Sequence, residues 1–236
     1  MKSIFEEIQE KLVAKNQIER LKQCIDIQYA LLELGKSLVS ASEIESAYTE
    51  YRRVVSHAEA LWEDACALYL RERFATALAL SITCLEEIGK ISVARLRLIF
   101  QSAVPRVLQM FPNASTEERR GNPFYSHSQK VLLAAGAGAL VNSRLDRILG
   151  MPAVIAFLDD VERGKIEPLR QSCLYSDVIS GQLHIPSEQV GSEQARFYVV
   201  LSGEVLAEVA GLEPSEWARL IAKVQEFEKQ IGHPHK

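Results

Sequence analysis

The chain has 236 residues, which is enough for one large domain or two small ones. It is 47% apolar and 25% charged, so it can bury a core and is not a disordered chain. Its net charge of −4 argues against a protein with an extended nucleic-acid-binding surface, because such surfaces are usually basic. A small basic site is still compatible with this charge. The N-terminus carries acids where a signal peptide needs an apolar run, and no stretch approaches the length of a membrane span. We therefore expect a cytoplasmic protein with no membrane partner.

The first half of the chain predicts long helices, because its first 104 residues contain no proline and only two glycines. Apolar residues recur at helical spacing over 3–36, which predicts a first helix. A second helix is predicted from near Ser42 to near Tyr69. The charged residues 71–73 then predict a tight turn before a third helix over 74–100.

Prolines and glycines divide the second half into shorter elements. No sequence repeat and no alternation of strands with helices is visible, so the fold class is all-α, a helical bundle. The predicted elements are an irregular connection over 102–123, a helix over 124–149, a short helix over 152–163, a loop or small hairpin over 172–186, a helix from Pro186 to Gly211 and a last helix from Pro214 to Gly232.

The third helix carries charges in an otherwise apolar sequence, FATALALSITCLEEIGKISVARLRLIF. A helix that is apolar on every side is a buried central helix, yet Glu86, Glu87 and Lys90 lie in its middle. Glu86 and Lys90 have the favourable i,i+4 order, so one interpretation is an intrahelical ion pair on a solvated strip. The other is a functional cleft, because buried charges are costly unless they are paired.

His127 is the histidine with the most suggestive neighbours, since Arg120 precedes it and Lys130 lies one helical turn beyond it. Histidine titrates near neutrality and transfers protons, while arginine and lysine hold phosphates. A histidine at a helix start is also commonly a packing or capping residue. Sequence spacing alone does not decide between these roles.

A third cluster consists of Arg170, Tyr175 and Asp177 in irregular chain. These side chains could line a pocket, or they could tie a loop to the bundle. No metal site is predicted, because the Glu-x-x-His pairs of a di-iron bundle do not occur.

Taken together, the runs ALALSITCLEEIGKI, FYSHSQK, LRQSCLYSDV and IPSE resemble the AbiV-type abortive infection proteins of bacteria, a branch of the HEPN superfamily. The resemblance covers about residues 55–211. It implies an all-helical fold, frequent homodimers, and arrest of the phage-infected cell through shutdown of translation, triggered in some members by a phage protein. Many HEPN proteins are metal-independent ribonucleases with an Arg-x4–6-His motif.

Carried over by position, the resemblance implies a set of site residues. Arg120 and His127 are separated by six residues that include Gly121 and Pro123, so the pair does not lie on one continuous helix as in the usual motif. His127 would be the general base or acid, while Arg120, Lys90 and Lys130 would stabilise charge on the phosphate. Glu86 and Glu87 would position them. Arg170, Tyr175 and Asp177 would be binding residues.

The sequence thus favours a phage-defence effector that acts on RNA or the translation machinery, with a metal-independent endoribonuclease as the candidate activity and no cofactor. The alternative is a non-catalytic helical protein that sequesters a nucleotide, a translation factor or a phage protein. Expected partners are a second copy, an RNA or ribosome-associated target and a phage-protein trigger, but not DNA. A monomer mass by light scattering would exclude the homodimer. We expect residues 1–50 to form a helical extension that packs on the bundle or across the dimer, and residues 51–236 to form the HEPN-like AbiV domain.

Overall fold

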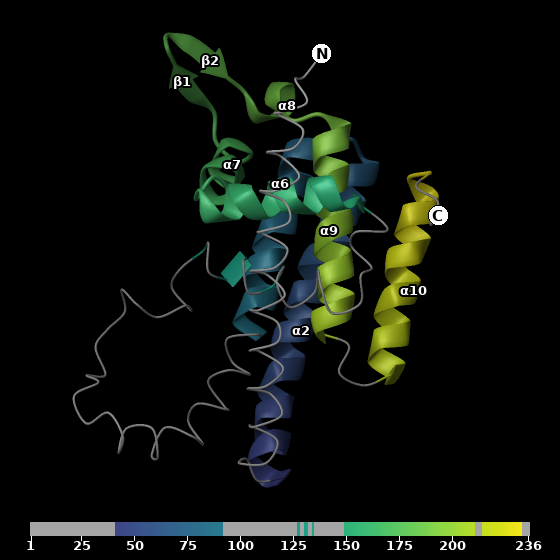
Figure 1. Cartoon of the computed structure of the whole chain (residues 1–236). Helices are drawn as coiled ribbons and strands as arrows, with labels where there is room; N and C mark the ends of the chain where they lie inside the picture. The colour runs from purple at the N-terminus through teal and green to yellow at the C-terminus, as the bar shows by residue number, and fades with distance from the viewer. Residues whose placement is uncertain are drawn as a thin grey trace, which may run out of the picture.

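The computed structural model describes residues 41–91, 149–210 and 214–232, together with positions 127, 130, 131 and 134. Helices dominate the described part, and one two-stranded hairpin is its only sheet (Figure 1). The predicted all-α class is therefore confirmed. No helix in the described ranges is both long and apolar enough to cross a membrane. The predicted helix over 3–36 and the connection over 102–123 lie outside the described residues.

A helical hairpin forms the centre of the bundle. Helix α2 (Ala41–Leu70) ends at a tight turn in which Glu72 adopts a φ of 60°, and the amide of Arg73 donates to the Leu68 carbonyl at 2.9 Å. The chain then returns as a helix over 74–91. The Cys84 thiol donates to the Ala58 carbonyl at 3.3 Å, so the two helices lie in direct contact. Both the long second helix and the turn were predicted correctly.

Helix α9 (Ser192–Ala210) packs against α2 through a close contact between an indole and a glycine. The Trp62 Nε1 group donates to the Val199 carbonyl at 3.0 Å. A Cβ atom on Gly203 would lie only 2.5 Å from the same nitrogen, so glycine makes room for the indole. Helix α10 (Pro214–Gln230) lies beside α9 and completes this side of the bundle (Figure 1).

Short elements cap one end of the bundle. Helix α6 (Met151–Glu162) runs across the long helices, and α7 (Ile166–Ser172) follows it (Figure 1). Strands β1 (Asp177–Ile179) and β2 (Gln182–His184) pair antiparallel through a two-residue loop, Ser180–Gly181, whose φ values are both positive. That loop suits the right-handed twist of a hairpin. Of the two alternatives expected for 172–186, a loop or a small hairpin, the structure has the hairpin, and it projects from the end of the bundle (Figure 1).

The structure differs from the sequence expectation at two of these elements. The helix predicted from Pro186 to Gly211 is broken into α8 (Pro186–Gln189) and α9. Val190 between them is extended, at φ −105° and ψ 112°, because its side chain turns into the core, where it is buried. Helix α7 was not predicted either, since Arg170 was expected in irregular chain but lies on this helix. Pro168 lies in the first turn of α7, where a missing N–H group costs no intrahelical hydrogen bond.

Candidate functional site

The candidate site is centred on Glu86, in the C-terminal part of the helix over 74–91. Its neighbours Leu85 and Ile88 are fully buried, and Glu86 itself is only 6% exposed. A carboxylate in such surroundings is costly unless it is paired. The contacts of Glu86 come from two other segments of the chain, residues 127–130 and helix α7.

The segment over 127–130 supplies two nitrogen partners to the same oxygen. His127 Nδ1 lies 2.8 Å from Glu86 Oε2, and the Lys130 ammonium lies 3.4 Å from it. Because an ionised carboxylate only accepts hydrogen bonds, Nδ1 carries the proton in this pair. Nε2 of the neutral imidazole is then left with a lone pair, on a side chain that is 47% exposed. Lys130 is buried and neutralises Glu86 from inside the protein.

Gly89 allows this segment to approach the helix. A Cβ atom at position 89 would lie 2.0 Å from the backbone carbonyl oxygen of Lys130, which is far inside van der Waals contact. Gly89 follows Glu86 by three residues, so the two positions lie on one side of the helix. The glycine in the Glu-Glu-x-Gly-Lys run therefore places His127 and Lys130 within reach of Glu86.

Helix α7 closes the other side of the site with an arginine–glutamate pair. The Arg170 guanidinium donates to both oxygens of Glu167, through Nε at 2.9 Å and Nη2 at 2.7 Å. Arg170 Nε also lies 3.8 Å from Glu86 Oε1, and Glu167 Oε2 lies 3.9 Å from His127 Nδ1. Hydrogen bonds from Arg170 lower the pKa of Glu167, outweighing the effect of its burial. We call Glu86, His127, Lys130, Glu167 and Arg170 the Glu86 cluster.

Lys90 does not pair with Glu86, contrary to the i,i+4 interpretation of the sequence. Its ammonium contacts Glu87 instead, at i,i+3. The Glu86 side chain is turned toward His127 and Lys130, whereas Glu87 and Lys90 are more exposed, at 15% and 33%. The Glu87–Lys90 pair is therefore separate from the contacts that Glu86 makes.

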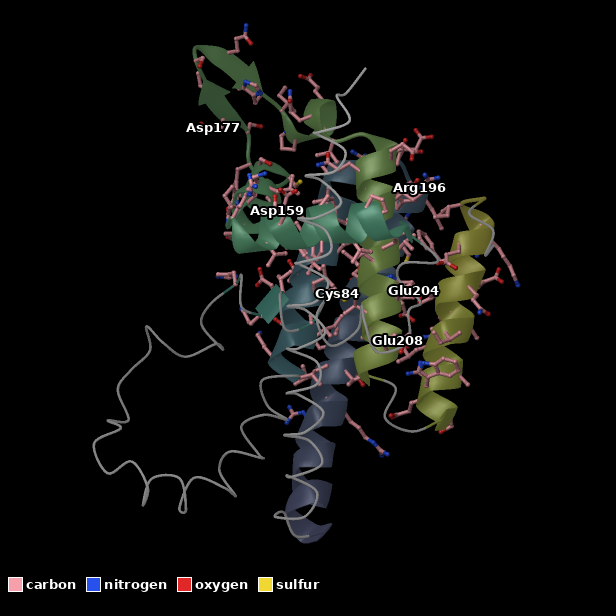
Figure 2. The ribbon with its side chains drawn as sticks, in the orientation of Figure 1. Cys84, Asp159, Asp177, Arg196, Glu204 and Glu208 are labelled. Atoms are coloured by element: carbon pink, nitrogen blue, oxygen red, sulfur yellow. The ribbon has the colours of Figure 1, made fainter. Side chains whose placement is uncertain are left out.

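The remaining predicted site residues lie elsewhere. Tyr175 is exposed just beyond α7. The Asp177 carboxylate accepts a hydrogen bond from its neighbour, the Val178 amide, at 2.7 Å, at the base of the hairpin (Figure 2). Arg120 lies outside the described residues. Their roles as binding or catalytic residues stay predictions.

Sequence reasoning missed Glu167. The available signal was its i,i+3 spacing to Arg170, which is favourable on a helix. That signal went unused because α7 itself was not predicted.

Three members of the cluster have donor atoms that could hold a metal ion. One atom each from Glu86, His127 and Glu167 lies within 4.8 Å of the others. However, Lys130 and Arg170 already balance the two carboxylate charges, and a divalent cation would have to compete with both. The arrangement suits proton transfer by His127 beside fixed cations better than metal ligation.

The fold and the cluster define a class of protein: an α-helical bundle in which a buried glutamate is paired with a half-exposed histidine. A family model for AbiV, of the HEPN group, matches residues 46–207, well over half of the chain. The chain belongs to the AbiV family of HEPN proteins. No curated protein and no solved structure is significantly similar to it.

Proposed function

We propose that this protein is a phage-defence effector that arrests the infected cell by cleaving RNA without a metal ion. The observation that carries the proposal is the hydrogen bond between the buried Glu86 carboxylate and the half-exposed His127 imidazole. This bond leaves Nε2 free for proton transfer to or from a substrate. Membership of the AbiV family supports the cellular role.

In the proposed reaction, His127 Nε2 takes the proton from a ribose 2′-hydroxyl. The 2′-oxygen then bonds to the adjacent phosphorus, and the P–O5′ bond breaks. The imidazolium returns the proton to the leaving 5′-oxygen, which yields a 2′,3′-cyclic phosphate and a 5′-hydroxyl. Glu86 stabilises the imidazolium between these two steps, as a buried carboxylate does in other acid–base pairs.

The cations take different parts in this scheme. The Lys130 side chain is only 7% exposed and lies against Glu86, so it supports the carboxylate and does not contact substrate. Lys90 is more exposed and lies on the same helix, one turn beyond Glu86, and we propose it as the cation that interacts with phosphate. Arg120 is proposed for the same task on its sequence position alone.

The test is incubation of the pure full-length protein with total RNA in EDTA. Wild type should cleave and His127→Ala should not. The variant should lose about 1–3 kcal/mol of stability, because Glu86 loses a hydrogen bond but keeps Lys130, and it should stay folded at the assay temperature. His57→Ala is the matched control, since His57 is an exposed histidine on α2. Cleavage by His127→Ala, or intact RNA with wild type, would overturn the proposal.

One observation favours a second, non-catalytic function, the sequestering of a translation factor or phage protein. Val178 and Leu183 are cross-strand partners on the hairpin, and both are more than 60% exposed. Paired exposed apolar side chains on a projecting element suit protein contact. Cell-free translation that is inhibited while RNA stays intact, and relieved by Val178→Ser with Leu183→Ser but not by His127→Ala, would favour this function.

A further inference from the structure

Tyr175 is an exposed aromatic side chain next to the Glu86 cluster. It is 64% exposed, whereas Tyr198 on α9 is buried in the core. Leu174 beside it is also exposed, at 42%. A tyrosine that only supports packing would bury its ring, because burial of an aromatic surface is a large part of its contribution to stability.

The backbone fixes Tyr175 close to the cluster. Its amide donates to the Gln171 carbonyl at 3.0 Å, an i,i+4 bond that extends the last turn of α7 to this residue. Gln171 in turn donates through Nε2 to Glu167 at 2.6 Å, beside the Arg170 pair. The pKa of Arg170 is raised chiefly by its hydrogen bonds with Glu167, and the nearby Tyr175 phenol adds a smaller contribution. Tyr175 therefore stands at the exposed end of the helix that carries Glu167 and Arg170.

We infer that Tyr175 is a stacking platform for a base of single-stranded RNA whose phosphate lies at the Glu86 cluster. The inference rests on the proposed ribonuclease function and adds that its substrate is single-stranded at the site. A base can stack on an exposed ring only when it is unpaired, so the site would take single strands and not duplexes. Every base has a π face, so the platform itself selects no sequence.

Rigid surroundings make the ring suitable for this task. The bidentate contact with Glu167 holds Arg170, and the hydrogen bonds of Gln171 hold the end of α7. A base stacked on Tyr175 would therefore place its sugar and phosphate beside fixed charges. This pre-organisation limits the entropy lost when the strand binds.

The experiment measures binding of a fluorescein-labelled, 2′-O-methylated oligouridylate to the full chain in EDTA. The methyl groups block cleavage, so binding is read separately from chemistry. Tyr175→Ala should weaken binding by about 5- to 150-fold, the usual loss for one stacked base, and Tyr175→Phe should retain it. Trp217→Ala is the matched control, because Trp217 is an exposed aromatic side chain on α10 with no part in the proposed site. Unchanged melting temperatures show that each variant is folded.

An abasic oligomer of the same length identifies the source of the effect. It should bind wild type more weakly than the oligouridylate does, and Tyr175→Ala should weaken it no further. Equal oligouridylate binding by wild type and Tyr175→Ala, with RNA cleavage intact, would overturn the stacking platform and leave the proposed function standing. Absence of both binding and cleavage by wild type would overturn the proposed function and the inference together.

Discussion

Replacing Glu86 by glutamine tests whether the buried charges of the cluster hold the site together. The substitution keeps the shape of the side chain and removes its charge. Lys130, which is 5% exposed, then keeps a buried ammonium whose carboxylate partner at 3.4 Å is gone. Burying an uncompensated charge is costly, so Glu86→Gln should destabilise the fold.

The magnitude follows from the distance and the burial. Two unit charges at 3.4 Å attract by about 5 kcal/mol at an effective dielectric constant of about 20. Removing one partner of a buried pair typically costs about 3–5 kcal/mol. In a domain of this size 1 kcal/mol lowers the melting temperature by about 2–4 °C, so we expect a fall of about 6–20 °C.

The reverse substitution, Lys130→Met, should cost less, about 1–3 kcal/mol. Glu86 would keep its hydrogen bond to His127 and its contact with Arg170. In the double variant neither charge is left unpaired, so its loss should fall short of the sum of the single losses by about 0.5–3 kcal/mol. Lys90→Met is the control and should cost at most about 1 kcal/mol, because its pair with Glu87 is more exposed.

Thermal and urea unfolding of the four variants and wild type would measure these differences. If Glu86→Gln unfolds like wild type, the Glu86 carboxylate does not stabilise the fold by neutralising Lys130, and this prediction is wrong. Strictly additive losses in the double variant would show that the two charges do not interact. A larger loss of stability for Lys90→Met than for Lys130→Met would show that Lys90, and not Lys130, forms the more stabilising ion pair.

Two further predictions concern the approach of the segments and the response to acid. Gly89→Ala should lower the free energy of unfolding by about 1–3 kcal/mol, because its Cβ would overlap the Lys130 carbonyl. The control Gly191→Ala, with open space around it, should change it by no more than about 0.5 kcal/mol. Equal unfolding curves for the two variants would contradict this. Hydrogen bonds from Arg219 hold the pKa of Glu59 below its usual value of 4.5 despite burial, so the folded state binds protons less readily than the unfolded chain. This contribution is present above pH 4.5 and disappears as the pH falls through the folded pKa, so Glu59→Gln should flatten the acid side of the stability curve; parallel curves for wild type and variant would contradict it.

Local patterns in the sequence were enough to predict most of the described fold. The scarcity of proline and glycine predicted α2 and the helix over 74–91, and the charged residues at 71–73 predicted the turn between them. Turn-forming and β-branched residues predicted a loop or a small hairpin over 172–186. These signals are reliable because helix, turn and hairpin preferences act between residues that are close in the chain. The charge of Glu86 within an apolar helix also predicted that this carboxylate needs a partner, either in an intrahelical pair or in a functional cleft.

The partners of that charge were decided by the tertiary structure. Local spacing favoured Lys90 as the partner of Glu86, yet the partners are His127 and Lys130, which are 41 and 44 residues away. Periodicity along one helix carries no information about which distant segment packs on it. The close approach at Gly89 likewise depends on where that segment lies in space.

The same reason explains Glu167 and the break at Val190. Glu167 joins the Glu86 cluster because α7 packs at the end of the bundle, and no pattern in its seven residues indicates that position. Val190 adopts an extended conformation because its side chain is buried in the core. The sequence alone thus determined the long helices and the presence of a costly buried charge. Only the packing of distant segments determined which groups neutralise that charge, because burial and charge pairing depend on neighbours in space.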